Sequence, residues 1–125
     1  MFDANCILLA SGSPGSGYRD GGSVYLWDVN SNKILATFAP EHTFDAEGIQ
    51  FNPSGTLLAF SNIADGLISE RFATLRLWDV ETQQERVVLK GTAPISRIRF
   101  SQDGRHIATA DWYDGDGVIR IWGVP

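Results

Sequence analysis

Short runs of alternating apolar and polar residues recur along the chain, separated by turn signals about every 8 to 12 residues. In the run 74–80 (TLRLWDV), Leu75 and Leu77 lie on one side of an extended strand, and Arg76, Trp78 and Val80 lie on the other. Both sides carry large apolar groups near the tryptophan, which is typical of a strand covered on both faces. Helical periodicity is nowhere sustained, so the pattern predicts an all-β fold.

The pattern occurs three times. The tryptophan stretch reads VYLWDV at 24–29, LRLWDV at 75–80 and IRIWGV at 119–124. Equivalent phenylalanines and alanines are spaced by 49 residues: Phe2, Phe51 and Phe100, and Ala10, Ala59 and Ala108. The distance from the repeat alanine to the tryptophan is 17, 19 and 14 residues, so we expect a loop of variable length between the second and third strands of each unit.

Turn residues divide each unit into short strands. The segments 52–55 (NPSG) and 101–104 (SQDG) place a glycine where a tight turn needs positive φ, whereas the first copy, 3–6, has no glycine. A further strand is expected after the tryptophan turn, at 33–38 and 85–89. Each unit is therefore predicted to have four strands. The first lacks most of its first strand and the third lacks its fourth, which leaves about ten strands.

These segments resemble WD40 repeats, and the resemblance covers essentially the whole chain. It implies that each unit is one four-stranded blade of a β-propeller, with the tryptophan on the third strand packing between adjacent blades. The implied structural residues are Trp27, Asp28, Trp78, Asp79, Trp122 and His42. The repeats are divergent. Phe60 stands where the family's Ser or Thr is expected, Gly123 replaces the aspartate, and His42 is the only candidate for the family's inter-blade histidine.

We expect a single segment, 1–125, made of three blades at 1–39, 40–90 and 91–125, in which the first and last are incomplete. A closed propeller typically needs 4–8 blades, so the chain is not expected to close a ring alone. Further blades come either from the same parent chain or from self-assembly. We favour a segment of a longer propeller, because neither end carries the polar cap that repeat arrays need.

Charge and composition exclude several classes. The formal net charge is −5 and the basic residues are scattered singly, which disfavours nucleic acid and anionic membranes as partners. One cysteine allows no intramolecular disulfide, and no apolar stretch approaches the roughly 20 residues that span a bilayer. We expect a cytoplasmic protein.

No catalytic residue, metal site or cofactor is predicted. The glycine-rich stretch 12–17 lacks the spacing of a phosphate-binding loop and is interpreted as a hairpin loop. The cluster Asp111, Asp114 and Asp116 does not follow the order of a calcium loop and is interpreted as a hairpin tip. Two histidines cannot supply a three-ligand zinc site.

The function predicted from these features is a non-catalytic protein-interaction scaffold. In the family's topology the loops between second and third strands share one face of the disc, and tyrosine, tryptophan and arginine dominate binding hot spots. The candidate partner-binding residues on these loops are Tyr18, Arg19, Leu67, Ile68, Arg71, Phe72, Trp112 and Tyr113. Three alternatives stay open. The loops could pack only locally, the chain could be a purely structural fragment, or it could be a propeller-fold enzyme with groups at a channel lined by the segments 46–51 and 95–100.

Overall fold

The structure is a computed structural model and describes residues 1–5, 7–13, 23–38, 49–65, 71–90, 95–113 and 116–125. The regular elements of this part of the chain are ten β-strands. Their bounds are β1 (Leu8–Ser13), β2 (Ser23–Asp28), β3 (Lys33–Phe38), β4 (Ile49–Phe51), β5 (Leu57–Asp65), β6 (Arg71–Asp79), β7 (Gln84–Lys90), β8 (Ile95–Phe100), β9 (His106–Tyr113) and β10 (Asp116–Gly123). In the described part of the chain, no helix is long and apolar enough to cross a membrane.

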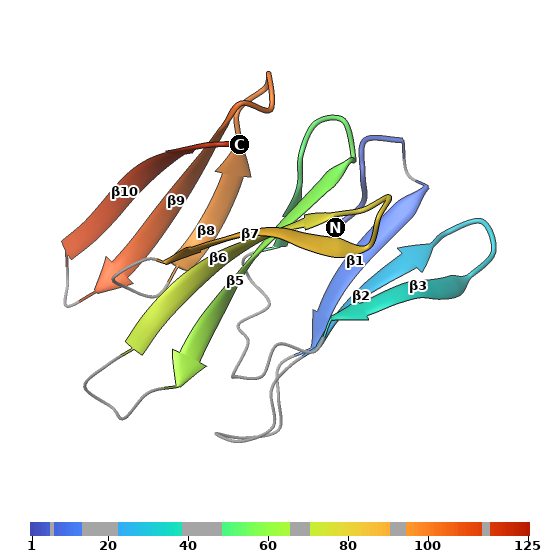
Figure 1. Ribbon diagram of the computed structural model, residues 1–125, viewed down its shortest axis with the longest axis horizontal. Helices are drawn as coiled ribbons and strands as arrows, with labels where there is room; N and C mark the ends of the chain where they lie inside the picture. The colour runs from blue at the N-terminus through green and yellow to red at the C-terminus, as the bar shows by residue number, and fades with distance from the viewer. Residues whose placement is uncertain (6, 14–22, 39–48, 66–70, 91–94, 114–115) are drawn as a thin grey trace.

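The strands form three antiparallel sheets that stand side by side (Figure 1). The first sheet has the order β1-β2-β3, the middle sheet β4-β5-β6-β7 and the third sheet β8-β9-β10. Within each sheet the strands follow one another as hairpins. The prediction of an all-β fold built from three antiparallel units in an unclosed row is confirmed.

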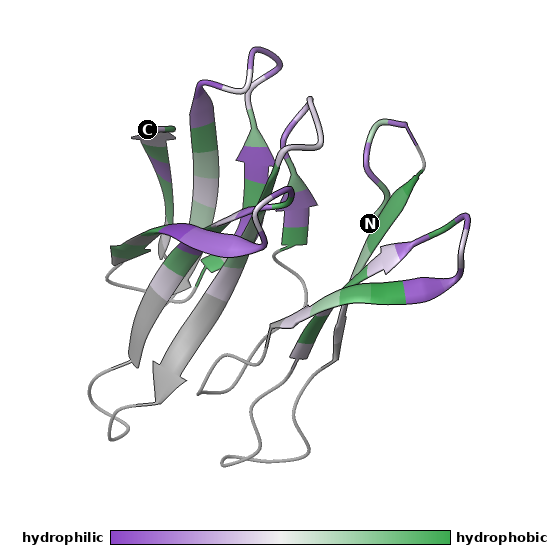
Figure 2. Ribbon diagram, turned by 45° about the vertical axis from the view of Figure 1, so that its right-hand side comes forward, coloured by the Kyte–Doolittle hydropathy of each residue, from purple (hydrophilic) through white to green (hydrophobic). Residues whose placement is uncertain are grey.

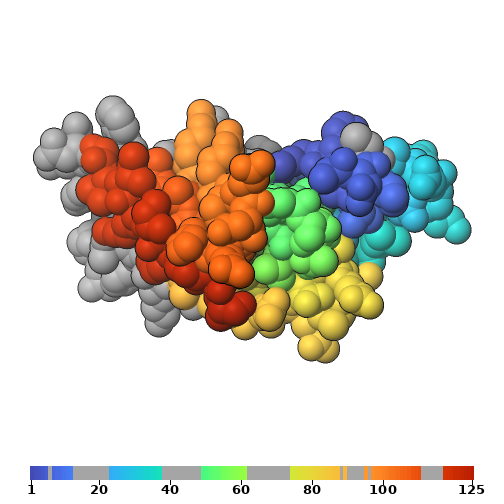
Figure 3. Space-filling model, turned by 90° about the horizontal axis from the view of Figure 1, so that it is seen from above, coloured from blue at the N-terminus to red at the C-terminus, as the bar shows by residue number. Residues whose placement is uncertain are grey.

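Hydropathy follows this architecture. Hydrophobic stretches lie along the strands, whereas the turns at one end of the stack are mostly hydrophilic (Figure 2). Viewed from that end, the third, middle and first sheets form consecutive slabs along the long axis of the molecule (Figure 3). The middle sheet is therefore covered on both faces, as the alternation in 74–80 predicts.

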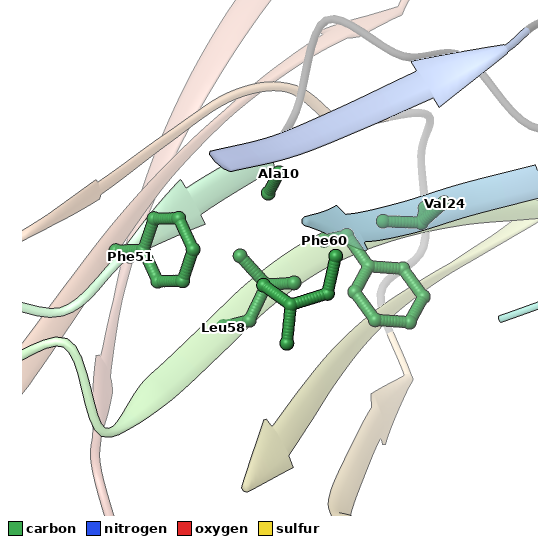
Figure 4. Close-up of a cluster of buried hydrophobic side chains, with 6 residues drawn as sticks. Ala10, Val24, Phe51, Leu58 and Phe60 are labelled. Carbon is green, nitrogen blue, oxygen red and sulfur yellow. The ribbon is translucent and has the colours of Figure 1, made fainter. Parts of the chain in front are cut away.

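One hydrophobic cluster joins the first sheet to the middle sheet. Ala10 from the first sheet meets Leu58 and Phe60 from the middle sheet (Figure 4). Leu26 of the first sheet belongs to the same cluster, and Trp78 packs against it. The four cluster residues named first are almost completely buried. Burial of apolar area at about 25 cal/mol per Å² makes such a contact the main attraction between sheets that share no hydrogen-bonded strand pair.

A second cluster joins the middle sheet to the third sheet. Leu75 and Leu77, on the other face of β6, meet Ile98 and Ile107 of the third sheet, and Trp122 packs against them. Trp122 thus repeats the placement of Trp78, one sheet further along the stack. Because adjacent side chains of a strand point to opposite faces, the Leu-Trp pair of β6 serves both clusters.

Candidate functional site

The candidate binding face lies where three hairpins end. The strands β1, β5 and β9 run in the same direction, toward the lower end of the stack in Figure 1, and each pairs with the strand that follows it. The connections between second and third strands therefore leave all three sheets at one end. The opposite end carries the turns 52–56 and 101–105, which join the first strand to the second in the middle and third sheets.

Four of the predicted partner-binding residues lie on the strands beside these connections. Arg71 and Phe72 begin β6, where they oppose Asp65 and Ala64 in the register. Trp112 and Tyr113 end β9, opposite Gly117 and Asp116 of β10. The backbone thus brings both pairs to the same end of the stack, but the side chains of these four residues lie outside the described part of the chain.

The remaining sequence candidates fall on residues that the structure does not describe. These are the partner-binding candidates Tyr18, Arg19, Leu67 and Ile68, the inter-blade candidate His42, and most of the glycine-rich stretch 12–17. The side chains of Asp111, Asp114 and Asp116 also lie outside the described residues. The roles of all these residues stay predictions.

Two of the three repeat tryptophans bond to a hydroxyl within their own sheet. The Nε1–H of Trp27 donates to Ser11 Oγ at 3.1 Å, and that of Trp122 donates to Thr109 Oγ1 at 3.0 Å. In the middle sheet the equivalent position is Phe60, which carries no hydroxyl and packs in the first cluster instead. In the middle repeat, where sheets cover both sides, this position thus contributes apolar contact.

Removing the Thr109 hydroxyl is expected to destabilise the third sheet. Thr109 is buried, so Thr109→Val keeps the shape of the side chain but leaves the Trp122 indole N–H without its acceptor. We expect a loss of about 1 kcal/mol in the free energy of unfolding, measured by urea denaturation. Thr109→Ser, which retains the hydroxyl, is the control. Equal stability of the valine variant and the unsubstituted chain would contradict this assignment.

The aspartate after the tryptophan organises the turn that leaves the strand. Asp28 Oδ1 accepts from the N–H groups of Asn30 and Ser31, at 2.9 and 3.0 Å, and Asp79 Oδ1 accepts in the same way from Glu81 and Thr82. This carboxylate-to-backbone bonding is a local alternative to the sheet ladder.

In both sheets a β-bulge precedes the turn, between Leu26 and Trp27 and between Leu77 and Trp78. In both turns the residue four positions after the aspartate, Asn32 or Gln83, has a positive φ of 55° or 57°.

These bonds make the turn sensitive to acid. The pKa of Asp79 lies below its ordinary value of 3.8, and the largest cause is the hydrogen bond from the backbone N–H of Thr82. Partial desolvation raises this pKa. The Thr82 hydroxyl, the Glu81 N–H and the charge of Arg86 lower it further. A carboxylate whose pKa is lower in the folded state than in the unfolded state stabilises the fold. This contribution is complete at pH values above the unfolded-state pKa, about 3.9, and it is lost as the pH falls through the folded-state pKa.

We therefore expect Asp79 to titrate below 3.8 when its carboxyl carbon is followed by NMR. Denaturation curves collected between about pH 5 and pH 2 should show a shallower loss of stability in Asp79→Asn than in the unsubstituted chain, because the amide does not titrate. A pKa at or above 3.8, or equal slopes for the two proteins, would show that the turn does not hold the carboxylate.

A second set of equivalent residues was missed by the sequence analysis. Asp3, Asn52 and Ser101 are spaced by 49 residues, and each accepts with its side chain from the backbone N–H five positions later, at 2.9 Å. Each also donates its own backbone N–H to the carbonyl of that residue. The common spacing was the available signal, but the three side chains differ chemically. The first turn therefore looked degenerate, although its backbone bonding is the same.

The glycines of the other two turns lie against the preceding turn. Gly55 and Gly104 have φ of 71° and 72°, the left-handed region that glycine adopts without strain. A Cβ on Gly55 would lie 3.4 Å from Asp3 Oδ2, and one on Gly104 would lie 3.7 Å from Pro53 Cδ. These turns form a continuous row across the three sheets at the end opposite the candidate binding face.

The inner strands β4 and β8 line the edge where a propeller has its channel. Arg99 Nη1 donates to Gln50 Oε1 at 3.0 Å, which links the third sheet to the middle sheet at this edge. Arg97 and Arg99 are exposed, whereas the other channel candidate, Glu47, lies outside the described residues. The described part of this edge thus holds two guanidinium groups and an amide. These groups do not form the acid–base pair that a catalytic site would use.

Comparison with known proteins agrees with this geometry. Residues 83–123 match the family model of the WD domain, G-beta repeat. The matched region begins within the turn before β7, the last strand of the middle sheet, and ends with β10, the last strand of the third.

Three relatives from different organisms are similar to the chain. It is 25% identical over 127 residues to a coronin-like protein of Saccharomyces cerevisiae, covering 93% of this chain and 18% of that protein. It is 33% identical over 89 residues to protein NEDD1 of Mus musculus, covering 71% and 12%. It is 26% identical over 126 residues to the protein LST8 homolog of Drosophila melanogaster, covering 94% and 34%.

The chain thus spans between 12% and 34% of the length of these relatives, which are WD-repeat proteins. The repeated WD stretches, the stacked sheets and the family match point to the same assignment. The chain is a WD40-repeat segment, and its three sheets are blades of an open part of a β-propeller.

Proposed function

We propose that this chain is a non-catalytic interaction scaffold that presents the connections between its second and third strands to a protein or peptide. The observation that carries the proposal is the common direction of β1, β5 and β9, which points three connections to one end of the stacked sheets. Loops held by such a scaffold are frequent sites of binding.

The chemistry of the strand ends supports a protein partner. Arg71, Phe72, Trp112 and Tyr113 belong to the residue types that carry most of the binding energy in protein interfaces. The similarity to WD-repeat proteins supports the same class of function, because that family consists mostly of interaction scaffolds. We extend the proposal to a cytoplasmic setting, for which the coronin-like relative is weak support.

Selection of peptides from a random display library against the immobilised chain tests the proposal. A selected peptide is then titrated by calorimetry against Arg71→Ala and Trp112→Ala. Loss of a hot-spot side chain is worth about 2 kcal/mol or more, so we expect affinity to fall about 30-fold or more.

Variants at the other end of the stack are the matched controls. Thr82→Ala and Gln102→Ala change exposed turn residues and should leave the affinity unchanged. Peptides whose binding depends on Thr82 or Gln102 and not on Arg71 or Trp112 would place the interaction on the turn end and overturn the proposal.

A further inference from the structure

Each sheet has two chemically different faces. Residues directly opposite in an antiparallel register lie on the same face. The face that carries the repeat tryptophan, here named the Trp face, includes Leu58 beside Trp78 in the middle sheet and Ile107 beside Trp122 in the third. The other face, here named the Ala face, pairs the repeat alanine with the residue before the tryptophan, as Ala59 pairs with Leu77.

Both contacts within the chain join an Ala face to a Trp face. Ala10, Val24 and Leu26 of the first sheet cover the Trp face of the middle sheet. Ala59, Leu75 and Leu77 of the middle sheet cover the Trp face of the third sheet. The same three repeat positions of the Ala face are used in both contacts. Each sheet thus packs its Ala face on the Trp face of the sheet that follows it in the chain.

Among the residues that the structure describes, one face of each kind remains uncovered. On the Ala face of the third sheet, Ile119 and Ile121 are 74% and 65% exposed, whereas the equivalent residues Leu75 and Leu77 are 0% exposed. On the Trp face of the first sheet, Phe2 is 53% exposed, whereas its equivalent Phe51 is 3% exposed. Leu9 and Trp27 pair directly on that face, and Phe2 bridges to Leu9.

One of the two uncovered faces is an Ala face and the other is a Trp face, the combination that already packs together twice within the chain. We propose that a second copy of this chain covers them: the Ala face of the third sheet of each copy packs on the Trp face of the first sheet of the other. The contact is head-to-tail, and a contact of this kind forms a ring when its rotation closes.

The number of sheets favours two copies. The described residues of each copy form three sheets, so two copies make six, which falls within the 4–8 blades that a closed propeller typically contains. Three copies would make nine and exceed that range. The occupant of both faces is therefore a second copy in a closed dimer, whose two identical contacts cover the Ala face of the third sheet and the Trp face of the first sheet in each copy.

Solution mass tests the proposal directly. The chain has a mass of 13.7 kDa, and light scattering after gel filtration is expected to give twice this value. Ile119→Arg and Phe2→Arg each place a charge in both contacts of the dimer and are expected to give monomers. Both positions are exposed within one copy, so the fold should persist, which far-UV circular dichroism checks.

Gln84→Arg is the matched control. Gln84 is an exposed residue at the start of β7 in the middle sheet, whose two faces are both covered within one copy, and its variant should remain a dimer. Mixing the Ile119→Arg and Phe2→Arg chains supplies a decisive test, because the pair retains one unmodified Ala face and one unmodified Trp face. An equimolar mixture should regain dimers although neither variant forms them alone.

Several results would overturn the proposal. A monomeric unsubstituted chain would show that a second copy does not cover these faces. A dimer insensitive to Ile119→Arg, or a mixture of the two variants that stays monomeric, would exclude the head-to-tail contact. Masses that keep growing with concentration would show an open chain of copies and exclude the closed pair.

Discussion

Replacing Phe60 by alanine is expected to lower the free energy of unfolding by about 3–5 kcal/mol. The Phe60 ring is 2% exposed and lies in the cluster that joins the first sheet to the middle sheet. Its removal leaves a cavity between two sheets that share no strand pairing, so the neighbouring side chains have little means of filling the space. Urea or guanidinium denaturation, followed by tryptophan fluorescence, measures the loss.

Phe60→Leu is the control for this prediction. Leucine keeps most of the apolar volume, and swaps that nearly conserve volume usually cost less than about 1.5 kcal/mol. The difference between the two variants isolates the cavity from any effect of losing the aromatic ring. If alanine and leucine were tolerated equally, Phe60 could not lie between two packed sheets.

Replacing Leu77 by alanine is expected to cost about 2–5 kcal/mol, because this side chain is completely buried between the middle and third sheets. The side chain before it in the alternation, Arg76, points to the opposite face and makes an ion pair with Glu85 at 2.6 Å. Both are partly exposed, and such pairs contribute less than about 1 kcal/mol. Substitution of Arg76 should therefore lower the free energy of unfolding several-fold less than substitution of its neighbour Leu77.

Leu35→Ala matches the chemistry of the Leu77 variant at a site that is 41% exposed. We expect it to cost clearly less, because much of the side chain is already in water. Both variants should be measured at one protein concentration, since association of copies would add to the apparent stability. A Leu77 variant no less stable than the Leu35 variant would show that the third sheet does not pack on the middle sheet.

The strand pattern of the fold could be predicted from the sequence because each strand carries its own signal. Alternation in 74–80 places Leu77 and Trp78 on opposite faces, and the two clusters contain one of them each. The predicted strands 33–38 and 95–100 coincide with β3 and β8. Strand ends carry a weaker signal: β7 extends one residue beyond the predicted 85–89 at both ends, where Gln84 pairs with Asp79 and Lys90 pairs with Thr74.

The candidate binding residues were less predictable, for a physical reason. Residues on loops follow no period, so Tyr18 or Leu67 can be assigned a face only from the topology of the flanking strands. The structure fixes that topology through β5 and β9, and the binding role of the loop residues stays a prediction. The turn residue Asp3 was missed because hydrogen bonding depends on an acceptor at one position, and Asp, Asn and Ser supply it equally well.

Through-space NMR contacts between side chains test the stacking of the three sheets most directly. The structure predicts nuclear Overhauser effects that connect Leu26 with the Leu58 and Phe60 cluster, and a separate set that connects Leu77 with Ile98 and Ile107. The two sets should not meet, since the middle sheet lies between them. Contacts that join Leu26 directly to Leu77 would mean that the sheets fold around a single core, and would contradict the account.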